Sequence, residues 1–167
     1  MIIQRLPITL QPVKMATQRV SHEGTLSLAL FSRLAQHCES LEGEVTVTLE
    51  SGRDIEGLVF LKGYLSTVLS LQCQRCNDPF EYPVSTEFML SPVFNHKDAK
   101  GLPSHYDPLL LDEDSVVVET MVEDELLLSL PLIPKHDLVD CKVKELPKAP
   151  FIATPKKNPF AVLKRAK

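Results

Sequence analysis

Apolar and polar residues alternate along the middle of the chain, and this period of two constrains the fold more than any other feature of the sequence. Short turn sequences separate the runs of alternation, which cover residues 45–50, 55–62, 65–73 and 80–90. Parallel strands need crossover connections of a dozen or more residues, for which these turns leave no room. The pattern therefore predicts an antiparallel meander of four strands, curved and barrel-like, within an α+β fold.

Two amphipathic helices are predicted to pack on this sheet. Thr25 and Ser27 precede apolar residues spaced by three and four, and this stripe ends near Gly43. The stripe comprises Leu28, Phe31, Leu34, Ala35 and Cys38. The second helix is expected to begin at about Asp112 and to end before Pro131. Its apolar side comprises Val118, Met121, Val122 and Leu126.

The second helix is also strongly acidic, with seven acidic residues and no basic residue between Asp112 and Glu125. Glu119, Glu123 and Asp124 are expected on its solvent face. Such a run is typical of a hydrated surface, and the alternative is a docking face for a partner protein.

Charge is divided unevenly along the 167 residues. Up to Cys141 the chain has 10 basic and 21 acidic residues, whereas the remainder has 8 basic residues and 1 acidic residue. We therefore predict one α+β domain over 1–141 and a flexible, basic, proline-rich tail over 142–167. Asn158-Pro159-Phe160 opens a short terminal helix or docking peptide in this tail. The tail is either a solubilising end or an arm that contacts RNA phosphates. The residues expected to make those contacts are Lys156, Lys157, Lys164 and Arg165.

Cysteine spacing indicates a metal site. Cys73 and Cys76 form a CxxC motif between two predicted strands, where a zinc knuckle would place two thiolates. His136 and Cys141 follow the second helix and complete a candidate Cys₃His set. Four protein ligands would leave no open position, so the ion would be a structural zinc rather than a hydrolytic one. A redox role is disfavoured, because no helix begins after the motif to lower the thiol pKa.

Most enzyme classes lack support in this sequence. It contains no GxSxG motif, Walker loop, dinucleotide fingerprint or HExxH motif, and we expect no catalytic activity. No apolar run approaches the roughly 18 residues of a membrane-spanning helix, and Pro7 and Pro12 interrupt the N-terminal segment. We therefore expect a cytoplasmic protein with no membrane partner.

Three blocks of the sequence, 71–80, 121–136 and 158–163, together resemble the YceD family of large ribosomal RNA subunit accumulation proteins. The middle block is the most specific of the three. The resemblance implies a bacterial protein that supports synthesis, processing or stability of 23S rRNA, without assigned catalytic residues.

The negative charge of residues 1–141, called the body below, determines which partner this implied role would involve. A body of such charge would repel the RNA backbone, so we expect contact with a large-subunit ribosomal protein or an rRNA-processing enzyme. The alternative is a zinc-stabilised module that binds 23S rRNA directly through its basic tail.

Overall fold

A computed structural model describes residues 2–18, 20–111 and 113–143 of the chain. The predictions for the tail from residue 144 onward lie outside these residues. They include the four basic residues Lys156, Lys157, Lys164 and Arg165 and the terminal helix over 158–163.

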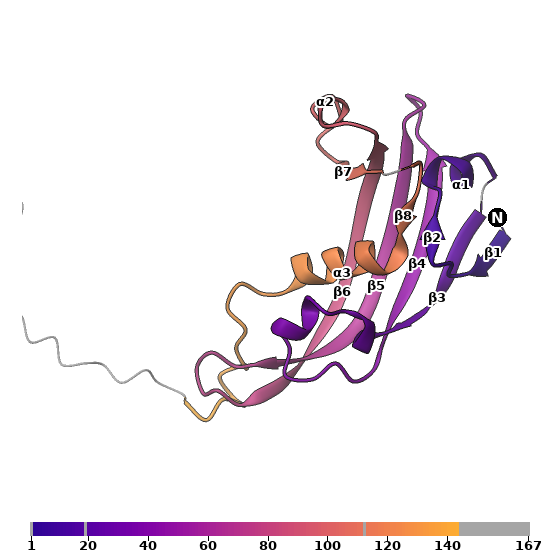
Figure 1. The fold of residues 1–167 in the computed structure, drawn as a ribbon. Helices are drawn as coiled ribbons and strands as arrows, with labels where there is room; N and C mark the ends of the chain where they lie inside the picture. Colours follow the sequence, from indigo (N-terminus) through magenta and orange to yellow (C-terminus); the bar gives the residue numbers. More distant parts are fainter. Residues whose placement is uncertain (1, 19, 112, 144–167) are drawn as a thin grey trace, which may run out of the picture.

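A six-stranded sheet is the main element of the fold, and its strands lie in the order β1-β3-β4-β5-β6-β7 (Figure 1). The strands are β1 (Ile2–Arg5), β3 (Val20–Ser27), β4 (Glu44–Arg53), β5 (Val59–Gln72), β6 (Pro79–Val93) and β7 (Asp107–Leu110). β4, β5 and β6 are antiparallel, which confirms the predicted meander with three strands in place of four, and β3 adds an antiparallel strand that was not predicted. The outer pairs are parallel, β1 with β3 and β6 with β7.

The barrel-like shape was wrong, because the sheet is open. Closure requires the two outermost strands to pair with each other. In the described part of the chain, β1 pairs only with β3, and β7 pairs only with β6.

The second and third predicted strands form the single strand β5. Gly63 does not end this strand; it lies in it opposite Phe88 of β6. The Phe88 ring occupies the space that a side chain at residue 63 would need, since a Cβ atom there would lie 1.9 Å from Phe88 Cζ. The glycine is therefore explained by close packing of an aromatic ring over the backbone.

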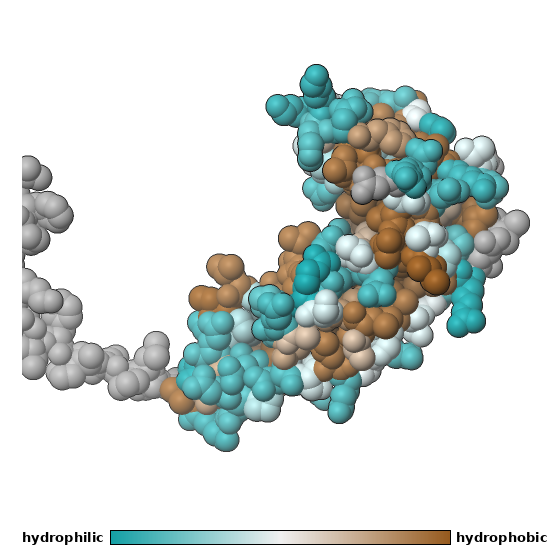
Figure 2. Space-filling model, viewed as in Figure 1, coloured by the Kyte–Doolittle hydropathy of each residue, from teal (hydrophilic) through white to brown (hydrophobic). Residues whose placement is uncertain are grey.

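Short helical elements, except α2 (His96–Ala99) beyond the end of β6, cover one face of the sheet (Figure 1). The other helices are α1 (Pro12–Gln18) and α3 (Val118–Ser129), with the 3₁₀ turns η1 (Leu28–Leu30) and η2 (Leu34–Gln36). A two-stranded sheet joins β2 (Thr9–Leu10) to β8 (Val116–Val117). Figure 2 shows apolar residues interspersed with polar ones over this side of the molecule.

The first predicted helix was wrong. Residues up to Ser27 extend β3, which pairs with β4, and the following residues form η1 and η2. Leu28, Phe31 and Leu34 are buried. Their spacing of three matches the period of a 3₁₀ helix as well as one face of an α-helix, so the pattern did not separate the two.

The second predicted helix is confirmed over α3, with a later start. Glu113 and Asp114 have φ of 49° and 63°, which an α-helix does not allow. Val116 and Val117 instead form β8. The helix ends at Ser129, before Pro131, and the four apolar residues predicted to face the core are buried. Within the described residues, no helix is long and apolar enough to cross a membrane.

Candidate metal centre

The turn between β5 and β6 brings Cys73 and Cys76 together. The Cys73 N–H donates to the Asp78 carbonyl at 2.9 Å, and the Asn77 N–H donates to the Cys73 carbonyl at 2.8 Å. Asn77 has φ of 63°, a left-handed conformation that asparagine tolerates better than most residues. These contacts fold residues 73–78 into a tight knuckle with Cys73 and Cys76 in it.

The segment after α3 returns to this knuckle and carries the second pair of candidate ligands. The Gln74 N–H donates to the Pro134 carbonyl at 2.9 Å, which fixes the returning chain. The His136 N–H donates to Cys73 Sγ at 3.4 Å, and His136 Nδ1 lies 3.3 Å from Cys76 Sγ. A turn in which the Cys141 N–H donates to the Asp137 carbonyl at 3.1 Å places the last cysteine.

All four predicted metal ligands therefore meet in the fold. One ligand atom from each of Cys73, Cys76, His136 and Cys141 lies within 4.8 Å of the others. Cys73 and Cys141 are buried, and the other two residues are half-buried. The sequence separates the two pairs by 60 residues or more, so only the tertiary fold could bring them together.

This donor set fits a structural zinc ion. Thiolate and imidazole groups are the ligands that zinc prefers, and sulfur atoms about 3.8 Å apart correspond to a tetrahedron with Zn–S bonds of about 2.3 Å. Zinc-bound thiolates commonly accept hydrogen bonds from neighbouring N–H groups, and the His136 backbone N–H donates such a bond to Cys73 Sγ. The four residues could thus hold one zinc ion with no position left for water.

The protonation of the two knuckle cysteines differs. Burial opposes ionisation of Cys73, but N–H groups of His136, Arg75 and Cys76 and the His136 side chain outweigh it and lower the pKa of Cys73 to about 5. For Cys76, the Asp78 backbone favours the thiolate, while burial and the neighbouring Cys73 and Cys141 raise its pKa. Cys73 is therefore a thiolate at neutral pH, as a metal ligand must be.

Neighbouring side chains hold this centre in place. The rings of Phe80 and His136 are 5.0 Å apart, and Lys142 Nζ lies 3.0 Å from an Asp78 carboxylate oxygen. The sequence alone did not indicate these contacts. Lys142 was assigned to the tail, yet its ion pair joins the segment after Cys141 to the knuckle.

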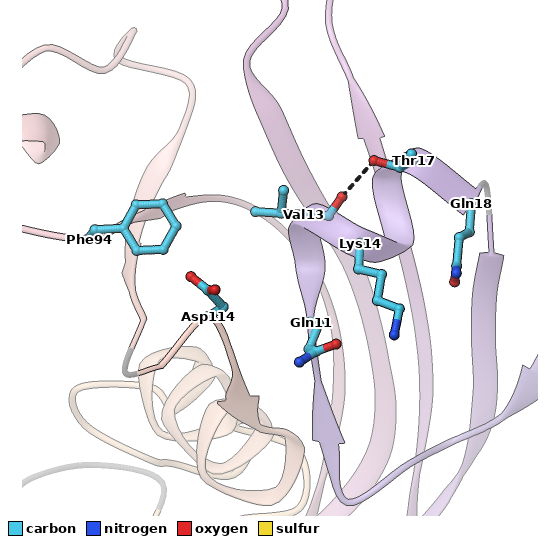
Figure 3. A pocket seen from close by; sticks show the side chains of 7 residues that line it. All are labelled: Gln11, Val13, Lys14, Thr17, Gln18, Phe94 and Asp114. Atoms are coloured by element: carbon cyan, nitrogen blue, oxygen red, sulfur yellow. Dashed lines mark hydrogen bonds between the residues drawn. The ribbon is translucent and has the colours of Figure 1, made fainter.

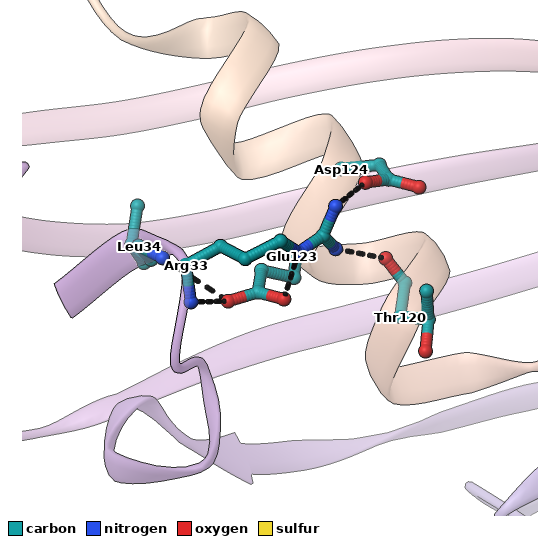
Figure 4. Close-up of polar contacts among 5 residues, drawn as sticks. All are labelled: Arg33, Leu34, Thr120, Glu123 and Asp124. Carbon is teal, nitrogen blue, oxygen red and sulfur yellow. Dashed lines mark hydrogen bonds and ion pairs between the residues drawn. The ribbon is translucent and has the colours of Figure 1, made fainter. Parts of the chain in front are cut away.

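One of the three acidic residues predicted on the solvent face of α3 is buried (Figure 4). Glu123 has a side chain that is 8% exposed, and its Oε1 accepts the backbone N–H groups of Arg33 at 2.6 Å and Leu34 at 3.1 Å. Its Oε2 accepts from Arg33 Nε at 2.7 Å. Arg33 also contacts Asp124 at 2.5 Å. The predicted exposure of Glu123 was wrong, because this carboxylate ties α3 to the start of the turn η2.

Glu119 and Asp124 do lie on the exposed side of α3, and their proposed contact with a partner stays a prediction. Away from the metal centre, a cavity of about 410 Å³ lies between α1 and the segment after β6 (Figure 3). Lys14, Asp114 and Phe94 line it, together with Gln11, Val13, Thr17 and Gln18. These side chains indicate no particular ligand.

Comparison with known proteins assigns the family. A family model described as "Large ribosomal RNA subunit accumulation protein YceD" matches residues 61–165. The chain belongs to the YceD family. A curated relative from Haemophilus influenzae, also named large ribosomal RNA subunit accumulation protein YceD, is 36% identical over 168 residues. That match covers 98% of this chain and 97% of the relative. No solved structure gives a significant match.

The YceD match confirms the resemblance seen in the sequence. Its span contains β6, α3 and all four residues of the metal centre, and it extends into the basic tail. Involvement in accumulation of the large-subunit rRNA follows from the family.

Proposed function

We propose that this chain is a non-catalytic cytoplasmic factor that supports synthesis, processing or stability of 23S rRNA during assembly of the large ribosomal subunit. The observation that carries the proposal is the match to a relative named for large ribosomal RNA subunit accumulation over almost the full length of both chains. The partner is a large-subunit ribosomal protein or an rRNA-processing enzyme.

The charge of the body supports protein contact over broad RNA contact. Up to Cys141 the chain has 21 acidic and 10 basic residues, and a surface of that charge repels phosphates but attracts basic proteins. Many ribosomal proteins are basic because they bind rRNA, so an acidic factor is complementary to them.

One structural zinc ion is part of this proposal. Bound by Cys73, Cys76, His136 and Cys141, it would join the end of the β5–β6 hairpin to the segment after α3. Protein purified without chelator is expected to contain about one equivalent of zinc. Zinc far below one equivalent, with all four thiols freely titratable, would contradict this assignment.

A second candidate function is direct binding of 23S rRNA through the tail. It is favoured by the 8 basic residues and single acidic residue after Cys141. Neutralising Lys156, Lys157, Lys164 and Arg165 would then abolish association with precursor particles.

Co-purification with precursors of the large subunit, before and after nuclease treatment, distinguishes the two functions. Association that persists after RNA digestion supports protein contact, whereas its loss supports the tail. The matched variants are Glu119→Gln with Asp124→Asn for the first function and the neutralised tail for the second. Glu123 is left unchanged because its replacement would disturb packing of the helix.

A further inference from the structure

The edge of β6 over residues 79–89 is the longest unpaired strand edge in the described part of the chain. Its neighbour β5 pairs with residues 79–90, while β7 on the other side pairs only with residues 90–93 (Figure 1). No other described strand pairs with residues 79–89 on that side. A run of unpaired N–H and C=O groups of this kind can accept an additional strand.

The direction of the backbone groups along this edge follows from the strand register. The Val93 carbonyl accepts the Leu111 N–H on the β7 side. The β5–β6 register runs without a bulge, so alternate residues before Val93 turn their backbone groups to the same side. These residues are Glu81, Pro83, Ser85, Glu87 and Met89. Pro83 lacks an N–H, so the free donors along the exposed stretch belong to Glu81, Ser85, Glu87 and Met89.

A second observation beside this edge indicates the charge of the occupant. A hollow of about 840 Å³ extends over the uncovered face of the sheet, from the loop before β4 across β5 to β6. Three carboxylates, of Glu42, Glu44 and Glu81, line it with serine and threonine hydroxyls, and no basic residue does. Glu87 continues the acidic line along β6, and its contact with Lys62 at 3.6 Å joins two exposed side chains and is weak.

Acidic character continues at the end of the edge that borders β7. There the pKa of Glu125 in α3 is raised, first by partial burial and then by the nearby charges of Asp107 and Asp124. None of the ion pairs among the described residues involves Glu125 or Asp107. Cationic side chains would reduce this repulsion.

Pairing with a second copy of this chain is disfavoured in the register centred on Val84. In an antiparallel pairing of two β6 edges centred on Val84, Glu81 of one copy would face Glu87 of the other. Like charges directly opposite each other destabilise strand pairs. The two glutamates thus disfavour this pairing of two copies, whereas they favour a strand with basic side chains.

We propose that an extended, basic segment of another protein binds as an additional strand along residues 81–87 of β6. Its cationic side chains lie toward Glu81, Glu87 and the acidic hollow. Its alternate, apolar side chains lie toward the face covered by α3, where Phe80, Tyr82 and Leu127 are only partly buried. This inference rests on the proposed function, and it adds the β6 edge to the exposed side of α3 as a surface by which the chain contacts a basic ribosomal or processing protein.

A synthetic peptide of alternating lysine and valine, roughly ten residues long to match the edge at about 3.3 Å per residue, tests the proposal on the full chain. Binding is measured by fluorescence anisotropy, and hydrogen exchange locates it. We expect slower exchange at the amides of Ser85 and Glu87. The same peptide methylated on every backbone nitrogen keeps its charge but should not bind.

Ser85→Pro removes a second N–H donor from an edge that already lacks the one at Pro83, and we expect it to weaken peptide binding at least about tenfold. The matched control is Tyr64→Phe, which loses the same Tyr64–Ser85 side-chain hydrogen bond of 2.9 Å without changing the edge. If Ser85→Pro does not fold, Glu81→Gln with Glu87→Gln should weaken binding in a salt-dependent manner, whereas Glu56→Gln should not.

Three results would overturn the proposal. The first is binding that is insensitive to backbone methylation and to these variants. The second is protection of the Ser85 amide in the peptide-free chain at low concentration, which would mean that the chain covers its own edge. The third is concentration-dependent dimerisation that protects the same amide. In each case the proposed function can be assessed separately, because it is measured by 23S rRNA levels in cells.

Discussion

Replacement of Glu123 tests whether a single buried carboxylate holds α3 to the start of the turn η2. Glu123→Ala leaves the backbone N–H groups of Arg33 and Leu34 without the oxygen that accepts both. An unsatisfied buried donor costs about 1–3 kcal/mol, and two of them, partly rehydrated beside the exposed Arg33 side chain, should cost about 2–4 kcal/mol. Urea unfolding of the full chain measures this loss.

The comparison with Glu123→Gln separates hydrogen bonding from charge. A glutamine oxygen can still accept hydrogen bonds from both backbone N–H groups. The glutamine NH₂ group then faces Arg33 Nε, whose N–H donates to Oε2 of the wild-type glutamate at 2.7 Å. We expect a smaller loss than in the alanine variant. Glu119→Ala, on the exposed side of the same helix, serves as the control and should change stability by less than about 0.5 kcal/mol.

The dependence on pH gives the sign of the charge contribution. Burial raises the pKa of Glu123. The N–H groups of Leu34 and Arg33 and the Arg33 guanidinium lower it by more than burial raises it, so the pKa in the folded chain lies below the ordinary value. Its stabilisation is therefore present above about pH 5 and is lost as pH falls through the folded pKa. The difference between wild type and Glu123→Gln should shrink over that range. An alanine variant as stable as Glu119→Ala would refute the reasoning.

Three further predictions follow from the packing and the metal centre. Gly63→Ala should destabilise the chain by about 1–3 kcal/mol, although alanine normally favours strands over glycine, because the new Cβ would overlap the Phe88 ring. Gly101→Ala, whose Cβ would lie 3.6 Å from its nearest neighbour, should be nearly neutral in the same thermal unfolding assay. Cys76→Ser should lose zinc by elemental analysis, whereas Cys38→Ser, outside the cluster, should retain it. Removal of zinc by a chelator should speed hydrogen exchange over residues 134–141 and leave β4 and β5 protected, because their core does not depend on the metal.

The sequence was sufficient for features that depend on local periodicity. The alternation over 45–90 predicted the antiparallel meander, and the apolar positions of α3 were correct. The four candidate ligands were also identified, because thiol and imidazole groups at such spacings have few other roles in this context.

The missed features depend on partners that are distant in sequence. The parallel pairing of β1 with β3 and of β7 with β6 could not be predicted, because local periodicity does not indicate which strands pair. Glu123 was placed on the solvent face because its acceptor role involves Arg33, 90 residues away. The 3₁₀ turns were taken for an α-helix because a spacing of three satisfies both periods.

The most direct test of the proposed role is the ratio of 23S to 16S rRNA in cells that lack this chain. Quantification during growth, with and without a plasmid carrying the wild-type sequence, should show a fall in 23S rRNA that the plasmid restores. An unchanged ratio together with normal sedimentation of large subunits would contradict the account.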